Sequence, residues 1–198
     1  MTDYLTATMT MLGPPENLYA DPHAWTRLHE ELGVDLPADY QAIIDAYAPI
    51  ELNGHLYLHH PATERWNLTT WIRDTIRAWS EVPWDDLDPD EDPRLLFGLE
   101  HLEFGTSSGL WPIASTNRGE TIFLHPGPDT PTLLIEDGEG GWTRYCISFT
   151  EWLYRYLTGE DMAGPNSSTF YPGPVKLRRL PMATSQHPEP WHGPDRGL

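Results

Sequence analysis

The sequence predicts an α+β fold: a mainly antiparallel sheet of about five or six strands with helices packed on one side of it. Three observations predict this fold. Apolar residues recur at helical spacing in most of residues 21–82, they form short strand-like runs over 95–147, and one further helix follows. Helices and strands are thus segregated along the chain. That order favours an antiparallel sheet over the alternating β–α units of nucleotide-binding folds.

Two helices are predicted at the start of the domain. Asp21 and Pro22 suit the cap and first turn of a helix that ends at Gly33, with the apolar stripe Trp25, Leu28 and Leu32. The next helix opens at residues 36–39 and ends before Pro49. Its apolar face comprises Tyr40, Ile43, Ile44 and Tyr47.

A hairpin and a third helix are expected next. The Asn53–Gly54 pair tolerates the positive φ angles of a tight turn, and it separates two alternating runs at residues 50–52 and 56–58. The third helix begins after a capping Asn67 and ends before Pro83. Its apolar stripe comprises Leu68, Trp71, Ile72, Thr75, Ile76 and Trp79.

The second half of the domain is strand-like. Runs at residues 95–99, 110–114, 121–124, 132–135 and 142–147 predict strands, and clusters of turn residues separate the later ones. A final helix begins at Ser148, which forms a capping box with Glu151 and is followed by an apolar face that ends before Gly159.

We divide the chain into an N-terminal extension (1–14), the α+β domain (15–161) and a C-terminal tail (162–198). The tail is rich in Pro and Gly and is expected to be irregular or to form a strap across the surface. No secretory signal and no membrane-spanning stretch is visible. The single cysteine, Cys146, cannot form an internal disulfide, and a reducing, cytoplasmic location is expected.

Charge limits the classes of partner. The 198 residues include 12 Lys and Arg against 30 Asp and Glu, a net charge of −18. Residues 1–100 hold 19 acids and 5 bases (−14), and residues 101–198 hold 11 and 7 (−4). Binders of nucleic acid or anionic lipid place Lys and Arg against phosphates, and this chain has one Lys, Lys176. We therefore expect neither as a direct partner and expect a basic protein instead.

Four segments stand in an order typical of one family: residues 32–40 (LGVDLPADY), Asn53–Gly54, the stretch from Phe104 to Trp111, and residues 147–153 (ISFTEWL). Together they resemble the SUKH superfamily, the Smi/Knr-type proteins that include many bacterial immunity proteins. The resemblance implies a non-enzymatic domain that binds and neutralises a cognate toxin, commonly a nuclease. The insert with the Trp71 helix and an acidic loop, and the long tail, depart from a minimal member.

The candidate partner-binding surface is acidic. It comprises Trp84, Asp85, Asp86, Asp88, Asp90, Glu91 and Asp92, with Glu136, Asp137 and Glu139. Alternating aspartates resemble a calcium loop, but a loop starting at Asp86 would need Gly and Glu where Glu91 and Phe97 stand. The acidic run is either a solvated connector or a surface that attracts a basic partner. Trp84 is either an interface anchor or packs the end of its helix.

Two other clusters suggest chemistry. Residues 105–109 match G-x-S-x-G, but the strand-like run after Ser107 favours a turn over the strand–helix elbow of a hydrolase. Its triad would need Asp129 or Asp137 with His187 or His192. His55, His59, His60 and Glu64 are dense, yet His55 and His59 would stand about 13 Å apart on a strand at roughly 3.3 Å per residue. They are expected to be exposed polar positions at a hairpin edge, and neither a metal nor another cofactor is expected.

Three functions are weighed. The first is an immunity-type protein whose acidic surface occupies a toxin's basic site. The second is a cytosolic scaffold or regulatory module that docks another protein through the Pro-rich tail, which includes residues 176–179 (KLRR). The third is a serine hydrolase that uses Ser107.

Overall fold

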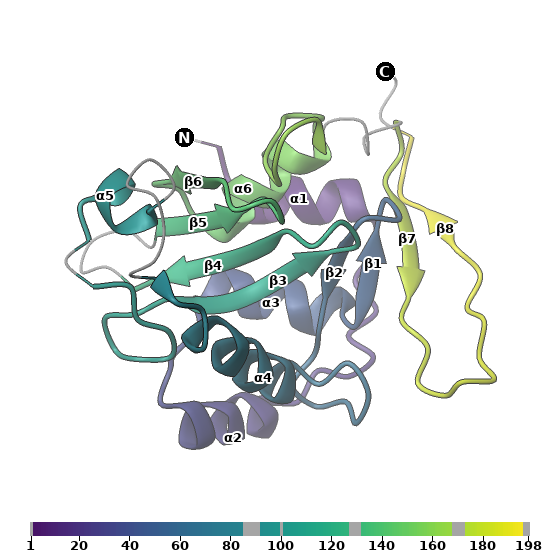
Figure 1. The fold of residues 1–198 in the computed structure, drawn as a ribbon. Helices are drawn as coiled ribbons and strands as arrows, with labels where there is room; N and C mark the ends of the chain where they lie inside the picture. Colours follow the sequence, from purple (N-terminus) through teal and green to yellow (C-terminus); the bar gives the residue numbers. More distant parts are fainter. Residues whose placement is uncertain (1, 85–91, 100, 127–131, 168–172, 196–198) are drawn as a thin grey trace.

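The computed structural model describes residues 2–84, 92–99, 101–126, 132–167 and 173–195 (Figure 1). Among these residues, six helices pack against one eight-stranded antiparallel sheet with strand order β6-β5-β4-β3-β2-β1-β7-β8. The predicted α+β class with a mainly antiparallel sheet is confirmed. The strand count is higher than the five or six expected, because the C-terminal segment adds two strands.

The three N-terminal helices follow local end signals. Helix α1 (Tyr4–Leu12) begins after Asp3, and α2 (Pro22–Leu32) begins after Asp21, whose carboxylate accepts the His23 N–H at 3.0 Å. Gly33 ends α2 in the left-handed conformation, with φ of 75°. Helix α3 (Ala38–Tyr47) ends before Pro49, as its sequence predicts.

The predicted hairpin and third helix are present. Strands β1 (Ile50–Leu52) and β2 (Leu56–Leu58) pair in antiparallel register around Asn53 and Gly54, which both have positive φ. Helix α4 (Leu68–Ser80) is capped by Asn67, which accepts the Thr70 N–H at 3.0 Å. Helices α2 and α4 lie together at the lower edge of the molecule in Figure 1.

The run at residues 95–99 is not a strand, so that prediction is wrong. It belongs to the short helix α5 (Pro93–Phe97), which Asp92 caps and Gly98 ends with a left-handed φ of 65°. The same combination of acidic cap, first-turn proline and terminal glycine starts and ends α2. In this five-residue segment the residues that start and end a helix therefore determine the structure, although the apolar run alone favours a strand.

The later strands form a meander as predicted. They are β3 (Trp111–Thr116), β4 (Thr121–His125), β5 (Thr132–Glu136) and β6 (Trp142–Tyr145). Helix α6 (Phe149–Leu157) follows, and Ser148 Oγ accepts the Glu151 N–H at 3.2 Å.

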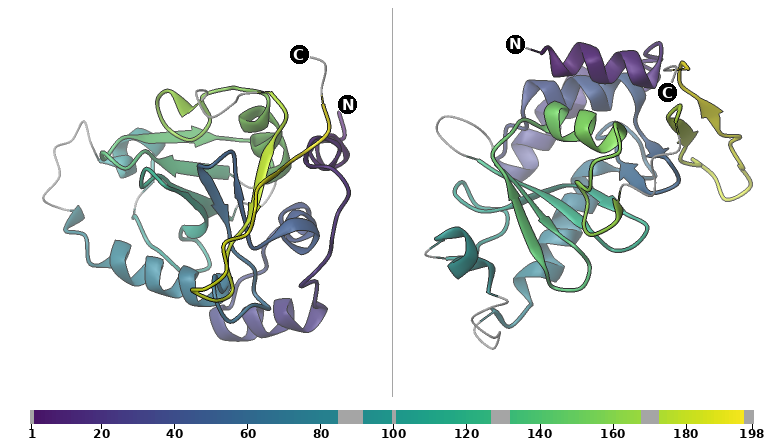
Figure 2. Two further views of the ribbon diagram at one scale, coloured as in Figure 1. Left: turned by 90° about the vertical axis from the view of Figure 1, so that its right-hand side faces the viewer. Right: turned by 90° about the horizontal axis from the view of Figure 1, so that it is seen from above.

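Both end segments join the folded unit. Strand β7 (Lys176–Arg179) pairs antiparallel with β1, and the two-residue β8 (Trp191–His192) pairs with β7 (Figure 2). Val175 and Leu177 are fully buried. At the other end, α1 packs on α6. The sheet core therefore extends into residues 162–198, for which the sequence predicts an irregular tail or a strap across the surface.

The core lies on both faces of the sheet. Ile122, Leu124 and Leu133 join the side chains of α3 and α6 in the larger cluster. Phe123 and Leu134 point to the opposite face, where they pack with Phe104, Leu110 and the end of α4. No helix within the described ranges has both the length and the apolar character needed to cross a bilayer.

Candidate functional site

The histidines expected at an exposed hairpin edge are buried. His55 and His60 have no exposed surface and His59 is 8% exposed. The expectation fails because β1 and β2 lie inside the sheet, with β7 on one side and β3 on the other. Within the described part of the chain, no three His, Cys, Asp or Glu side chains are grouped so that they could hold a metal ion.

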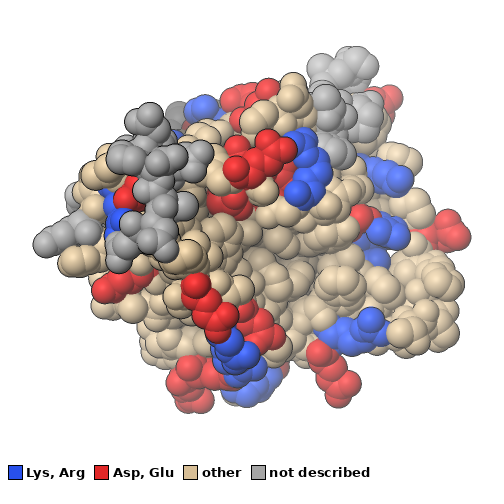
Figure 3. Space-filling model, viewed as in Figure 1, with Lys and Arg blue, Asp and Glu red and all other residues tan. Residues whose placement is uncertain are grey.

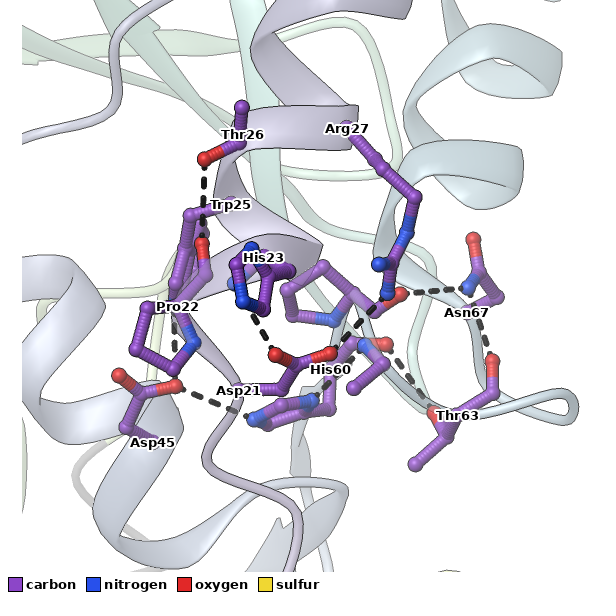
Figure 4. Close-up of polar contacts among 12 residues, drawn as sticks. Asp21, Pro22, His23, Trp25, Thr26, Arg27, Asp45, His60, Thr63 and Asn67 are labelled. Carbon is purple, nitrogen blue, oxygen red and sulfur yellow. Dashed lines mark hydrogen bonds and ion pairs between the residues drawn. The ribbon is translucent and has the colours of Figure 1, made fainter.

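His60 belongs to a polar network that joins α2 and α3 (Figure 4). Its Nδ1 accepts the Ala62 N–H at 3.0 Å, so the neutral ring carries its proton on Nε2, which lies 3.3 Å from Asp45 Oδ1. The same carboxylate oxygen accepts the Trp25 indole N–H at 2.9 Å. Burial lowers the pKa of His60, and the Asp45 carboxylate opposes that shift.

His55 forms a second buried network. Its Nδ1 lies 2.9 Å from the Tyr156 hydroxyl, and its Nε2 lies 3.7 Å from the buried Glu120 carboxylate. Arg118 pairs with the other oxygen of Glu120 at 3.2 Å. Burial lowers the pKa of His55, and the Glu120 carboxylate acts in the opposite direction. These contacts join two turns of the sheet to α6, so this cluster stabilises the fold.

The predicted acidic surface is described in part. Asp85, Asp86, Asp88, Asp90 and Glu91 lie outside the described residues. Asp92 is 7% exposed, caps α5 and pairs with Arg94 at 2.8 Å. Hydrogen bonds from the Arg94 side chain hold the pKa of Asp92 below its usual range. The Asp92 carboxylate is therefore already engaged within the chain.

Trp84 packs the end of its helix, one of the two alternatives that the sequence leaves open. Its ring stacks on Trp79 with centroids 5.7 Å apart and planes 14° apart, and it also stacks on Phe104. Its indole N–H donates to the Trp79 carbonyl at 3.1 Å. The ring remains partly exposed, at the rim of a hollow that also includes Arg94 and His101.

The three later acidic positions differ from one another. Glu136, at the end of β5, is 5% exposed and accepts the Gly140 N–H at 3.0 Å, and burial raises its pKa. Asp137 is partly exposed and accepts the Glu139 N–H at 2.9 Å, and Glu139 itself is exposed. Trp142 joins the two acidic regions, since it pairs with Glu136 in the sheet and its ring centroid lies 6.2 Å from that of Trp84.

Figure 3 shows how charge is distributed on one face. Acidic side chains stand in several separate groups, some beside Lys or Arg, and the described residues form no continuous acidic patch on this face. Any acidic docking surface in this region therefore includes only a few exposed carboxylates of described residues.

Ser107 lies in a turn. Phe104 and Leu110 form an isolated bridge around the turn, and β3 begins directly after it at Trp111. A hydrolase elbow would need a helix in that position. Asp129 lies outside the described residues, and His187 and His192 belong to the β7–β8 ribbon, four strands away from β3 in the sheet order. The structure thus does not bring the predicted triad together.

The basic tail segment also has partners within the chain. Arg178 pairs with the buried Glu51 at 2.5 Å, and Arg179 pairs with Glu16 and lies over the Trp191 ring. Four of these residues belong to β7, β1 and β8, so the pairs fasten the C-terminal ribbon to the sheet.

A hollow between α2 and α3 was not predicted from the sequence. Its lining includes Trp25, Leu28, Val34 and Asp35. No sequence signal indicates it, because its lining combines residues of α2, of the α2–α3 connection and of α3.

The fold defines the class of protein, an α+β domain with an antiparallel sheet. Residues 19–155 match the model of the SMI1/KNR4 family (SUKH-1), and the chain belongs to that family. Its members are generally immunity proteins against toxins and are typically not enzymes. Neither the search of curated proteins nor the search of solved structures finds a match.

Proposed function

We propose that the chain is an immunity-type protein that binds and neutralises a cognate bacterial toxin. The observation that carries the proposal is the family match over residues 19–155. The protein acts in the cytoplasm and works by occlusion, with its acidic surface covering the basic site of the toxin. A nuclease fits this mechanism well, because its groove must be positive to hold nucleic acid.

Charge gives the mechanism a kinetic consequence. A chain of net charge −18 attracts a basic partner over a distance comparable to the Debye length, which raises the association rate at low salt. The surface of this mechanism comprises Trp84, the acidic run Asp85, Asp86, Asp88, Asp90, Glu91 and Asp92, and the turn residues Glu136, Asp137 and Glu139. Asp92 and Glu136 are 7% and 5% exposed, so they add charge to this surface more than direct contact. Among the described members, Asp137 and Glu139 offer the most exposed carboxylates.

The test uses the toxin encoded by the neighbouring gene. Co-expression with the chain should protect cells, and the association rate should fall at least about tenfold from low to physiological salt. Replacing Asp85, Asp86, Asp88 and Asp90 by Asn should slow association. The matched control changes four exposed carboxylates elsewhere, Glu64, Asp74, Glu160 and Glu189, to amides. Absence of protection contradicts the function. A rate independent of salt, or equal effects of the two variants, contradicts the acidic mechanism.

A further inference from the structure

The hollow between α2 and α3 has the composition of a side-chain socket. Its volume is about 310 Å³, which is at the small end of ligand pockets and suits one side chain better than a whole cofactor. Leu28, Val34 and Leu36 form an apolar floor, and each is at most 6% exposed. Trp25 forms a wall, and His29 and Asp35 stand at the rim.

The Trp25 wall is held in place from behind. The indole N–H donates to Asp45 at 2.9 Å, and Asp45 in turn lies 3.3 Å from the fully buried His60 (Figure 4). The ring also makes an edge contact with the buried Tyr40. A side chain restrained by such contacts loses little conformational entropy when a partner binds, as the anchors of protein interfaces require.

The rim is negatively charged. Asp35 contacts His29 at 2.9 Å, yet its side chain is 86% exposed and open to a partner. The residues that line the hollow include this one acid and no Lys or Arg. The arginines of α2 and α4 that belong to this region are in ion pairs, Arg27 with Asp21 and Arg73 with Glu31. The charge of the hollow is therefore complementary to a cation.

We infer that this hollow receives an arginine side chain of a basic protein partner. The methylene stem would cover the apolar floor, and the planar guanidinium would lie beside Trp25 and bond to the Asp35 carboxylate. Arginine fits better than lysine, because its guanidinium stacks on aromatic rings, bonds to carboxylates in two places and is weakly hydrated. The identity of the partner rests on the proposed function, whereas the chemistry of the socket does not.

The socket can be tested without a toxin. In NMR titrations, Nα-acetyl-arginine methylamide should cause saturable shifts of the Trp25 indole N–H and the Gln41 side-chain amide, which also lines the hollow. The neutral isostere, Nα-acetyl-citrulline methylamide, should cause none, and Asp35→Asn should weaken the arginine response several-fold. Equal responses to arginine and citrulline, or an undiminished response in Asp35→Asn, would overturn the inference. An equal response to Nα-acetyl-lysine methylamide would overturn the preference for arginine over lysine.

The toxin provides the second test. Asp35→Lys should weaken its binding at least about tenfold, because a cation would then face a cation at the socket. The control is Glu189→Lys, which makes the same charge change at an exposed position of the C-terminal ribbon and should alter affinity less than about twofold. Equal losses would overturn the socket and leave the immunity function standing. Failure of the unmodified chain to bind the toxin contradicts the immunity function, and the analogue titrations then decide the socket alone.

Discussion

Trp25 on α2 donates its indole N–H to the carboxylate of Asp45 on α3, across 2.9 Å. The bond joins two helices that are short on their own. Replacing Asp45 by Ala would leave the indole N–H without its acceptor and would remove the carboxylate that lies 3.3 Å from Nε2 of the buried His60. We expect a loss of about 2 kcal/mol in the free energy of unfolding, measured by urea denaturation at neutral pH. Asp35→Ala, at a position 86% exposed, should change it by no more than about 0.5 kcal/mol. Equal effects of the two substitutions would show that the Asp45 network has no structural role.

The C-terminal ribbon contributes to the core through Leu177. Its side chain is fully buried, whereas Lys176 beside it is exposed. Leu177→Ala should therefore reduce stability by about 3 kcal/mol, and Lys176→Ala should have little effect. Thermal and urea unfolding measure both. A Leu177→Ala protein as stable as the unmodified chain would mean that β7 is not part of the cooperative unit.

This result also affects how truncations are designed. Removing residues 164–198 to test a docking tail would expose β1 along its length, since β7 pairs with residues Ile50, Glu51 and Leu52. Loss of partner binding would then follow from loss of structure. Point substitutions on the exposed side of the ribbon separate the two effects.

The contribution of Trp84 to packing at the end of α4 can be measured with two substitutions. Trp84→Ala removes a ring that stacks on Trp79 and Phe104 and should reduce stability by about 2 kcal/mol. Trp84→Phe keeps one aromatic ring but loses the bond to the Trp79 carbonyl and part of the stacked area, which should reduce stability by about 1 kcal/mol. If both variants unfold like the unmodified chain, the ring does not support the helix end.

His59 makes stability depend on pH. Burial lowers the pKa of His59 from 6.5 to about 4. Between these two pH values the unfolded chain therefore binds a proton at His59 and the folded chain does not. Stability is then unaffected above pH 6.5 and falls as the pH drops from 6.5 towards 4, by about 2 kcal/mol at pH 5. Urea denaturation at several pH values measures the slope.

The matched variant for this prediction is His59→Phe. The His59 ring makes edge contacts with Trp66 and Trp71, and its Nδ1 has no hydrogen-bond partner among the described residues, so an apolar ring suits the position. Between pH 7 and pH 5, the free energy of unfolding of the variant should fall by about 2 kcal/mol less than that of the unmodified chain. Glu136, whose pKa is raised, acts in the opposite direction in both proteins and cancels in the comparison. Parallel pH curves would contradict the prediction.

Elements with local end signals could be predicted from the sequence. Asp21, Asn67 and Ser148 each cap the helix that follows, and Asn53–Gly54 forms the expected turn. In each case the residues in contact are at most three positions apart along the chain, so the local sequence is enough to predict them.

Features that depend on distant partners could not be predicted. The segment at Lys176–Arg179 has three cations in four residues and resembles an exposed tail, and it becomes a strand only because β1 pairs with it. The burial of His55 depends on Tyr156 and Glu120, and the burial of His60 depends on Trp25 and Asp45. The sequence places Trp25 on the apolar stripe of its helix, but its place in the wall of a hollow also requires the position of α3.

The pairing of β1 with β7 has a consequence for biosynthesis. Ile50 and Arg179 are partners separated by 129 positions, and α1 likewise packs on α6, which is synthesised much later. A ribosome adds roughly 5–20 residues per second, so β1 emerges several seconds before its partner strand. During that interval β1 can pair only with β2, and the edge that β7 later covers stays open. Rapid completion of the chain, or a chaperone bound to residues 50–58, would protect this edge from aggregation.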